Sequence, residues 1–257
     1  KKLFQTIGNI IELIEKDDIP KYLLFLENAF PYMDNYNYHK GMNGIIQELT
    51  GLLKTKNIGT DSDRALLLDF QATLETKPEK AIKLEKDALA QIETITADNA
   101  RLVSNLHANL GGLYRMNAHP DLAREHMEKS ISLLDQFNLL HINDSIPQIA
   151  NYAMFLTEQQ EPERGISELQ KLSGIIKEYH SDDCLDYAKV QETLGTIYLM
   201  TANLPQAKTH FKRAFKIYEK IWADEPEMIE AKYQEIQELY PQIGFCIGKN
   251  LSGLLTK

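Results

Sequence analysis

Prolines recur along this sequence at a fixed spacing of 42 residues. Pro78, Pro120 and Pro162 are each 42 residues apart, and one further step reaches Leu204, with Pro205 beside it. An acidic or amide side chain follows each proline directly. Proline is favoured in the first turn of a helix, where its missing N–H would have no partner, and an acid there suits the positive end of the helix dipole. The spacing therefore predicts that a helix begins at the same place in four repeated units.

Small residues keep the same period. Three residues beyond each helix start lie Ala81, Ala123, Gly165 and Ala207. Nine residues before each start lie Asp69, Gly111, Ala153 and Gly195, of which only the first is not small. Small side chains let two helices approach closely, and apolar residues at three-and-four spacing surround them, so each unit is predicted to be an antiparallel helix pair. One pair cannot bury its apolar face alone. We therefore predict an all-α fold, an alpha-alpha superhelix of stacked pairs.

Two stretches of the repeat resemble a known family. LGGLY at Leu110–Tyr114 and LGTIY at Leu194–Tyr198 resemble the first-helix signature of tetratricopeptide repeats, and Ala207, Phe211 and Ala214 resemble the second-helix signature. The period of 42 residues exceeds that family's usual length of about 34. In this it is similar to the longer repeats of kinesin light chains and of many bacterial signalling proteins. The resemblance implies a scaffold that binds a protein or peptide.

The repeat is regular only in the middle of the chain. The first unit has Asp69, Ala72 and Glu85 where the signature has glycine, tyrosine and a large apolar residue, which we interpret as a degenerate copy. One period outside the four units, His39 and Lys249 break the phase. We therefore predict divergent helical repeats over residues 1–59, four tetratricopeptide-like units over residues 60–225 and C-terminal capping helices over residues 226–257.

Charge and cysteine content narrow the choice of partner. The 257 residues have a formal net charge of −9, so we expect no nucleic-acid binding by this segment. Cys184 and Cys246 lack metal-ligand spacing, which favours a reducing, cytoplasmic location over a disulfide framework. No apolar run reaches the roughly 18 to 20 residues that span a bilayer, so we expect no membrane partner. The sequence begins with Lys1, as a domain excised from a larger signalling protein would.

No residue pattern typical of an active site is found in the sequence. It has no phosphate-binding loop, no HExxH, no paired CxxC and no GxSxG. Gly111 and Gly112 lie inside a helix signature and are interpreted as packing residues. Among the seven histidines only His119 and His126 are close enough to suggest a shared site, and because no ladder of acids or cysteines surrounds them we interpret them as solvated. We predict no enzymatic activity, no cofactor and no metal site.

Asparagines on the first helices are the most informative polar residues. Asn109 and Asn151 are 42 residues apart, and each directly precedes a signature position. The resemblance implies that such asparagines face the concave groove and grip the backbone of a bound peptide, since an amide offers both a donor and an acceptor. Asn105 lies four residues earlier, on the same helix face, and Arg115 adds a cation for a carboxylate.

Two hypotheses of function remain from the sequence. The first is a scaffold that holds an extended peptide segment in its concave groove, as the sensing or docking domain of a larger bacterial-type signalling protein. The second is a structural module that self-associates into a homo-oligomer through its convex face or terminal helices. Residues 241–255, PQIGFCIGKNLSGLL, are rather apolar for an exposed tail and allow this alternative.

Overall fold

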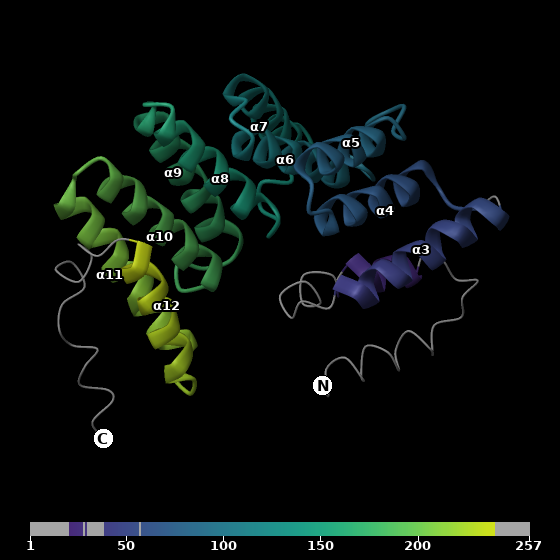
Figure 1. Cartoon of the computed structure of the whole chain (residues 1–257). Coiled ribbons are helices and arrows are strands. Elements are labelled where there is room, and N and C mark those ends of the chain that lie inside the picture. Colours follow the sequence, from purple (N-terminus) through teal and green to yellow (C-terminus); the bar gives the residue numbers. More distant parts are fainter. Residues whose placement is uncertain (1–20, 28, 30–38, 57, 240–257) are drawn as a thin grey trace. The chain divides into compact units, whose positions relative to one another are not determined.

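The computed structural model describes residues 21–27, 29, 39–56 and 58–239 (Figure 1). Every element of regular structure within these residues is a helix, which confirms the all-α prediction. Residues 21–27 form a short helical stretch. The helices that follow are α3 (His39–Lys56), α4 (Asp61–Leu74), α5 (Pro78–Leu89), α6 (Ala100–Met116), α7 (Pro120–Gln136), α8 (Ser145–Glu158), α9 (Pro162–Tyr179), α10 (Leu185–Met200), α11 (Leu204–Ile221) and α12 (Pro226–Leu239).

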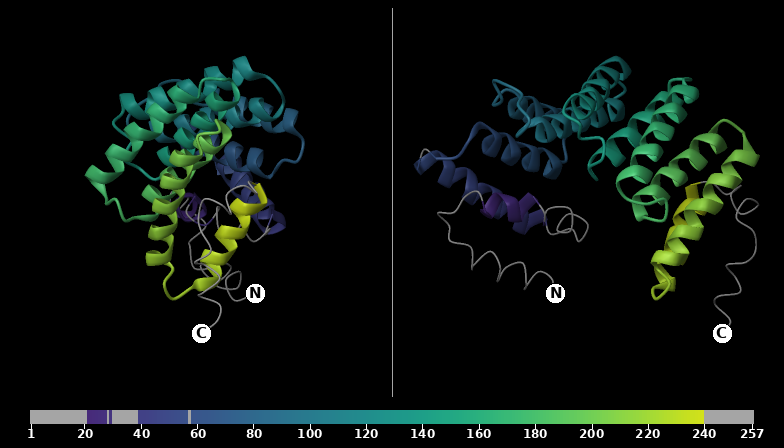
Figure 2. Two further views of the ribbon diagram at one scale, coloured as in Figure 1. Left: turned by 90° about the vertical axis from the view of Figure 1, so that its left-hand side faces the viewer. Right: turned by 180° about the vertical axis from the view of Figure 1, so that it is seen from behind.

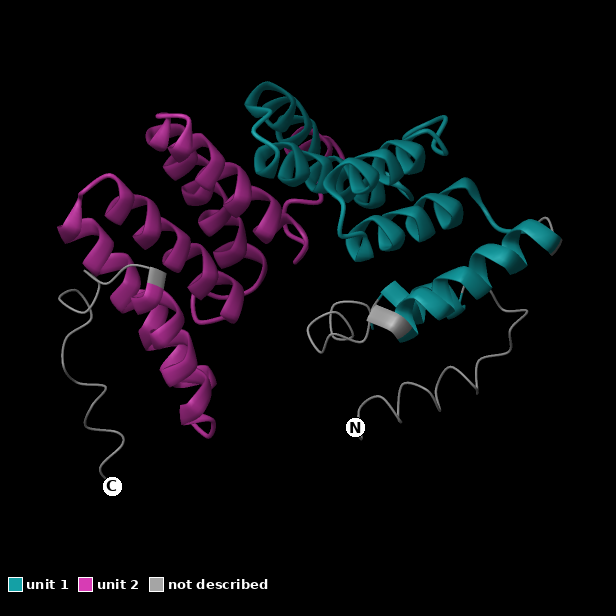
Figure 3. Cartoon of the chain, viewed as in Figure 1, with its two compact units in different colours: residues 1–130 teal, residues 131–257 magenta. Residues whose placement is uncertain are grey.

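The chain divides into two compact units, residues 1–130 (unit 1) and residues 131–257 (unit 2), which Figure 3 shows in different colours. Within unit 1, α4 packs against α5, and α5 packs against α6. Within unit 2, the pairs α8 with α9 and α10 with α11 are joined by a contact between α8 and α10. Figure 2 shows these helix pairs from two further sides. Stacked pairs are therefore present inside each unit, while the predicted limits of the repeat region remain predictions.

The recurring prolines begin second helices, as predicted. Pro78, Pro120 and Pro162 are the first residues of α5, α7 and α9, and Pro205 lies in the first turn of α11. The turns before three of these helices share a second periodic feature, a left-handed residue, found at Ala118 (φ 57°), Gln160 (φ 65°) and Ala202 (φ 59°). A left-handed residue ends a helix and lets the chain reverse. The first helix of a pair therefore ends, and the second helix begins, at a fixed position in the 42-residue period.

The small residues mark close contacts between the two helices of a pair. A β-carbon built on Gly165 of α9 would lie 2.6 Å from the carbonyl oxygen of Ala153 on α8. One built on Gly195 of α10 would lie 2.9 Å from the ring of Phe211 on α11. Gly111 of α6 is confined in the same way by α7. Only hydrogen fits at these positions, which confirms the predicted close approach.

Each unit has its own hydrophobic core. In unit 2 the large buried side chains include Ile149, Leu172, Leu194, Phe211 and Tyr218. In unit 1 the N-terminal helical stretch joins α3 and α4 through Tyr22, Leu26, Met42, Ile46, Leu49, Leu67 and Phe70. The residues before the regular repeats are therefore part of a packed helical layer, and α3 has the position of a helix preceding the α4 and α5 pair.

A polar network attaches α12 to the last repeat in unit 2. The Tyr218 hydroxyl on α11 donates a hydrogen bond of 2.6 Å to Glu192 on α10. Lys232 on α12 forms an ion pair with the same carboxylate at 2.9 Å, and also contacts Glu235. The side chains of Lys232 and Glu192 are only 21% and 18% exposed, so this pair is better shielded from water than most ion pairs on the molecule.

The described helices include none that is long and apolar enough to cross a membrane. Some sequence predictions fall outside the described residues. These are residues 1–20 of the predicted divergent N-terminal repeats, Cys246 and the apolar stretch at residues 241–255.

Candidate functional site

The predicted site residues of unit 1 share helix α6. Asn109 is exposed, and its amide nitrogen donates a hydrogen bond of 2.8 Å to the Asp69 carboxylate on α4. Asn105 lies one turn earlier on the same face and is half-buried. Arg115 lies in the last turn of α6 and is also half-buried, where a cation suits the negative end of the helix dipole. The structure therefore brings Asn105 and Asn109 together as a pair of amides, with Arg115 further along the same helix.

Asn151 is placed in the other unit. It lies on α8, one period after Asn109, and is exposed. Its side-chain amide makes no hydrogen bond with other described residues. The two asparagines therefore differ in their surroundings, since the amide nitrogen of Asn109 is already engaged by a carboxylate.

Two acids of the first repeat lie side by side, Glu85 buried and Asp69 half-buried. Glu85 on α5 is 1% exposed, and one of its carboxyl oxygens, Oε2, has no hydrogen-bond partner. Burial, together with the charge of Asp69, raises the pKa of Glu85 to about 10. Burial also raises the pKa of Asp69 to about 6, although hydrogen bonds with Glu85 and Asn109 work in the opposite direction. At neutral pH, Glu85 is therefore protonated beside an ionised Asp69.

This pair explains why the first repeat looked degenerate. Asp69 and Glu85 occupy the periodic positions that hold Gly195 and Phe211 in the last repeat, where a small residue receives a large apolar one. Both positions differ from the last repeat, and a carboxyl pair occupies the place of the apolar contact. The polar side chains lie between α4, α5 and α6, directly behind the exposed Asn109.

The histidines are arranged differently from the prediction. His126 on α7 is half-buried and its Nδ1 lies 2.8 Å from Nδ1 of His107 on α6, while His119 is exposed and contacts only the edge of Tyr114. The Tyr114 ring stacks on His126 with 5.4 Å between ring centroids. The interpretation of His126 as solvated is therefore wrong. The packing of α7 on α6 buries its ring, and burial lowers the pKa of His107 to about 4.

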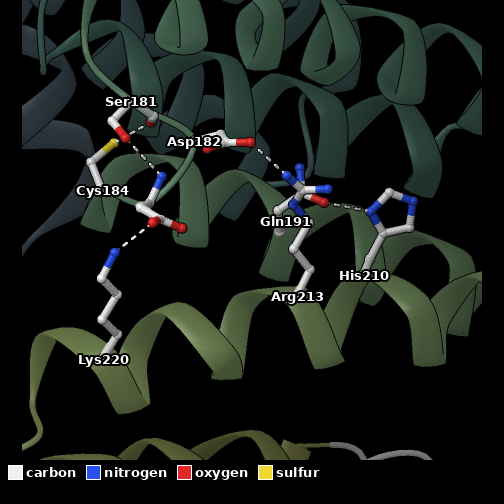
Figure 4. Close-up of polar contacts among 8 residues, drawn as sticks. Ser181, Asp182, Cys184, Gln191, His210, Arg213 and Lys220 are labelled. Carbon is white, nitrogen blue, oxygen red and sulfur yellow. Dashed lines mark hydrogen bonds and ion pairs between the residues drawn. The ribbon is translucent and has the colours of Figure 1, made fainter.

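The same arrangement recurs two periods later in unit 2. His210 on α11 bonds through Nδ1 to the Gln191 side-chain oxygen at 2.9 Å (Figure 4), and Tyr198 stacks on its ring at 5.3 Å. Each member lies 84 residues after its counterpart in unit 1. Burial lowers the pKa of His210. This recurrence favours a packing role for both clusters. No group of three or more metal-ligating side chains is found among the described residues.

A further polar cluster fixes the turn before α10, as Figure 4 shows. Arg213 on α11 donates to Asp182 at 2.9 Å, and Lys220 pairs with Asp183. The Cys184 sulfur caps the first turn of α10 by accepting a backbone hydrogen bond. The four charged side chains are 46% to 65% exposed. Ion pairs this exposed are screened by water and contribute little to stability, so we interpret the cluster as one that orders the turn.

A cavity of about 410 Å³ lies in unit 1 between α3, α4 and α5. Sequence reasoning missed it, because the repeat phase does not extend into α3. Five of its eight lining residues carry an amide, hydroxyl or carboxylate and three are aliphatic: Asn43, Ile46, Gln47, Thr50, Gln71, Leu74, Glu75 and Leu84.

Comparison with sequence families identifies one segment. Residues 145–220, which include α8 to α10 and nearly all of α11, match the model of the tetratricopeptide repeat. Among curated proteins, none matches the sequence.

Several solved structures have a similar fold. BtubC (BKLC) from P. vanneervenii has a TM-score of 0.57 and 16% identity over 88% of this chain and 85% of that protein. The kinesin light chain-type repeats of a Podosopora anserina protein have a TM-score of 0.58 and 14% identity over 76% of this chain and 93% of that one. A singly substituted form of the latter has a TM-score of 0.60 at 13% identity, over 77% of this chain and 94% of that one. Identities this low show likeness of fold.

Proposed function

We propose that this chain, which carries tetratricopeptide repeats and folds like kinesin light chain repeats, is a scaffold that holds an extended peptide segment of a partner protein. Tetratricopeptide repeats generally mediate protein–protein interactions. The observation that supports the finer proposal is the exposed amide of Asn151 on the first helix α8, within the segment that matches the family. An exposed, unengaged amide on a rigid helix is suited to pair with a peptide group.

Asn109 supports the proposal in a different way. Because Asp69 accepts a hydrogen bond from its amide nitrogen, the orientation of the Asn109 side chain is defined before any ligand binds. The Asn109 carbonyl oxygen is then the group left to accept an N–H from a peptide. Side chains that are already positioned lose less conformational entropy on binding, which improves affinity.

The i, i+4 spacing of Asn105 and Asn109 also fits an extended ligand. Four residues along a helix rise about 6 Å. Alternate residues of an extended chain are about 6.6 Å apart. Two amides one turn apart can therefore contact successive peptide groups of the same orientation, and Arg115 offers a cation for an acidic side chain or a terminal carboxylate.

The experiment compares binding to an array of overlapping ten-residue peptides before and after substitution. Replacing Asn109 and Asn151 by Ala together removes the proposed contacts of both units. The double substitution is expected to weaken binding of selected peptides at least about fivefold, whichever unit holds the peptide, because at least one hydrogen bond of about 1 kcal/mol is lost. Gln170→Ala removes an exposed amide from the second helix α9 and serves as the matched control. Unchanged affinity of the double variant would show that these asparagines do not hold the peptide.

Within a cell, we propose that the scaffold acts as the docking or sensing part of a cytoplasmic signalling protein. The array experiment separates this role from binding itself, because it needs no assumption about the rest of that protein. A partner found through the selected peptides would be tested by co-purification with the wild-type chain and with the Asn109→Ala, Asn151→Ala variant. Loss of the partner from the variant is the expected result.

A further inference from the structure

The cavity between α3, α4 and α5 is lined by side chains to which no role has yet been assigned. Its volume of about 410 Å³ falls within the range of about 300 to 1,000 Å³ that is typical of ligand sites. It lies within unit 1, and none of its lining residues belongs to the asparagine site on α6. Whatever binds there would not require Asn109 or Asn151.

One wall of the cavity is a row of polar side chains on α3. Asn43, Gln47 and Thr50 follow one another at intervals of four and three residues and so share one helix face. The amides of Asn43 and Gln47 are exposed and make no hydrogen bond with other described residues. Their separation of about 6 Å along the helix is close to the two-residue repeat of about 6.6 Å in an extended peptide.

The facing wall is contributed by α4 and its C-terminal cap. Gln71 donates a hydrogen bond of 3.4 Å to the Thr50 hydroxyl, and this contact joins α4 to α3 across the cavity. The Thr50 hydroxyl itself donates to the Ile46 carbonyl oxygen at 2.7 Å. Polar groups are thus aligned on both sides, and the Asn43 and Gln47 amides on α3 are the ones left to meet a ligand.

The remaining lining gives the cavity an aliphatic part and a single charge. Ile46 is 1% exposed, and Leu74 and Leu84 are half-buried, so an apolar side chain would find three aliphatic contacts. Glu75 supplies the only charged group in the lining. A hydrogen bond from the Lys77 backbone N–H to its carboxylate lowers the pKa of Glu75, which keeps the group negative at neutral pH.

We propose that this cavity is a second peptide-binding site, for an extended segment in which an aliphatic side chain is next to a lysine or arginine. The Asn43 and Gln47 amides pair with alternate peptide groups of the segment. The aliphatic side chain packs against Ile46, Leu74 and Leu84, and the basic side chain pairs with Glu75. An acidic or uniformly polar segment fits this lining poorly, because it would place a charge beside Glu75 or leave the aliphatic surface in water.

The test uses acetyl-valyl-leucyl-lysyl-valine amide as the probe and the ¹⁵N-labelled full chain. Titration is expected to shift the side-chain amide signals of Asn43, Gln47 and Gln71 in a saturable manner. Replacing Asn43 and Gln47 together by Ala is expected to weaken the probe's affinity at least about fivefold, which corresponds to loss of about one net hydrogen bond. Both residues are exposed on a helix, so alanine preserves the fold.

Three controls define the outcome. Gln170→Ala should bind the probe as the wild type does, and a probe with glutamate in place of lysine should bind more weakly. The Asn109→Ala, Asn151→Ala variant should also bind the probe normally. Absence of saturable shifts, or equal affinity for the Asn43→Ala, Gln47→Ala variant, would overturn the inference. If the probe is lost only from the Asn109→Ala, Asn151→Ala variant, the second site is wrong while the function proposed above stands.

Discussion

In unit 1, α4 and α5 meet through Asp69 and Glu85, whereas in unit 2 the same point of the period between α10 and α11 is occupied by Gly195 and Phe211. The unit 2 contact consists of a fully buried ring that fills the space left by a glycine. The unit 1 contact consists of two carboxyl groups, one of which must keep a proton. The helices pair at this point of the period in both units, although the contact is polar in unit 1 and apolar in unit 2.

The difference shows that the repeat depends on volume at this position more than on polarity. A polar contact is tolerated where both side chains change together and where a third group completes it. In unit 1 that third group is Asn109, which donates to Asp69 from the neighbouring first helix. Buried polar groups need partners to avoid a large desolvation cost. The acid pair is thus less favourable for stability than an apolar contact would be, but it orients the Asn109 amide at the proposed peptide site.

The largest predicted effect comes from placing one acid in the apolar contact. Gly195→Asp introduces a carboxylate beside the Phe211 ring, where even a β-carbon would lie 2.9 Å from the nearest ring atom. The ring can neither share a proton with the new carboxylate nor donate a hydrogen bond to it. We expect a loss of about 3 to 5 kcal/mol in the free energy of unfolding of unit 2, measured by urea denaturation.

Gly174→Asp is the matched control for this substitution. Gly174 lies in the helix α9 of the same unit and is exposed, and a β-carbon added there would have nothing within 4 Å. Its substitution is expected to change stability by less than about 1 kcal/mol, since aspartate and glycine differ little in helix propensity. Equal destabilisation by both substitutions would mean that the contact with Phe211 is not what excludes the carboxylate.

The second prediction converts the acid contact into an apolar one. Asp69→Gly with Glu85→Met reproduces the pair that the next repeat has at Gly111 and Met127. Replacing buried charged groups by packed apolar ones is often stabilising by about 1 to 4 kcal/mol. We expect a gain in that range at pH 7, reduced by about 1 kcal/mol for the new glycine in α4.

The two single variants complete a double-mutant cycle for this pair. Glu85→Met alone leaves Asp69 beside an apolar side chain, and Asp69→Gly alone leaves a space beside Glu85. Each is expected to be less stable than the double variant, with a coupling energy of about 1 kcal/mol or more. Strictly additive effects would show that the two carboxyl groups do not act as a unit.

The third prediction concerns pH. A carboxyl group that binds its proton more tightly when folded stabilises the folded state most below its unfolded pKa of about 4. That contribution is lost as the pH rises, through about 6 for Asp69 and about 10 for Glu85. The negative charge of Glu27 near Asp69 acts in the same direction as burial, while the Asn109 hydrogen bond opposes it.

The measurement is the stability of the wild type minus that of the Asp69→Gly, Glu85→Met variant between pH 5 and pH 7. We expect this difference to become less favourable to the wild type by about 1.4 to 2 kcal/mol per pH unit as the pH rises, because Glu85 keeps one proton throughout this range and Asp69 loses a second. One proton corresponds to about 1.4 kcal/mol per pH unit. His107 and His126 titrate in both proteins and cancel in the difference. A difference independent of pH would show that neither carboxyl group has a raised pKa.

Much of the helical arrangement could be predicted from the sequence, because it depends on steric rules that act locally. A proline can begin a helix but rarely continue one, and Gly165 must lie where another backbone passes. The repeat phase therefore placed the second helices correctly. It could not place α3, where the phase is absent, and so the cavity lined by Asn43 and Gln47 was missed.

The polar contacts were harder to predict, because they join residues that are distant in sequence. Asp69 and Glu85 each differ from the signature, but their meeting becomes visible only when both are compared with the paired positions of other repeats. His126 was compared with His119, its neighbour in the chain, although its partner is His107 on the preceding helix. The available signal was that histidine and tyrosine recur together after 84 residues.

The smallest effect at neutral pH is predicted for the histidine cluster, where the two units again differ at one position. His107→Gln makes the unit 1 cluster resemble that of Gln191 and His210, because an amide can also bond to Nδ1 of the facing histidine. We expect a change of less than about 1 kcal/mol at pH 7. A histidine whose pKa is lowered on folding, here to about 4, stabilises the folded state above its unfolded pKa and loses that contribution as the pH falls.

The variant should therefore lose less stability than the wild type between about pH 6.5 and pH 4, the range between the unfolded and folded pKa values of His107. Urea midpoints across this range give the comparison, with the exposed His119→Gln as the control that should follow the wild type. Parallel curves for wild type and His107→Gln would mean that His107 takes up its proton as readily in the folded chain as in the unfolded one. In that case the short contact with His126 would not exclude the charged form of His107, and the two clusters would differ in chemistry although they occupy the same position of the period.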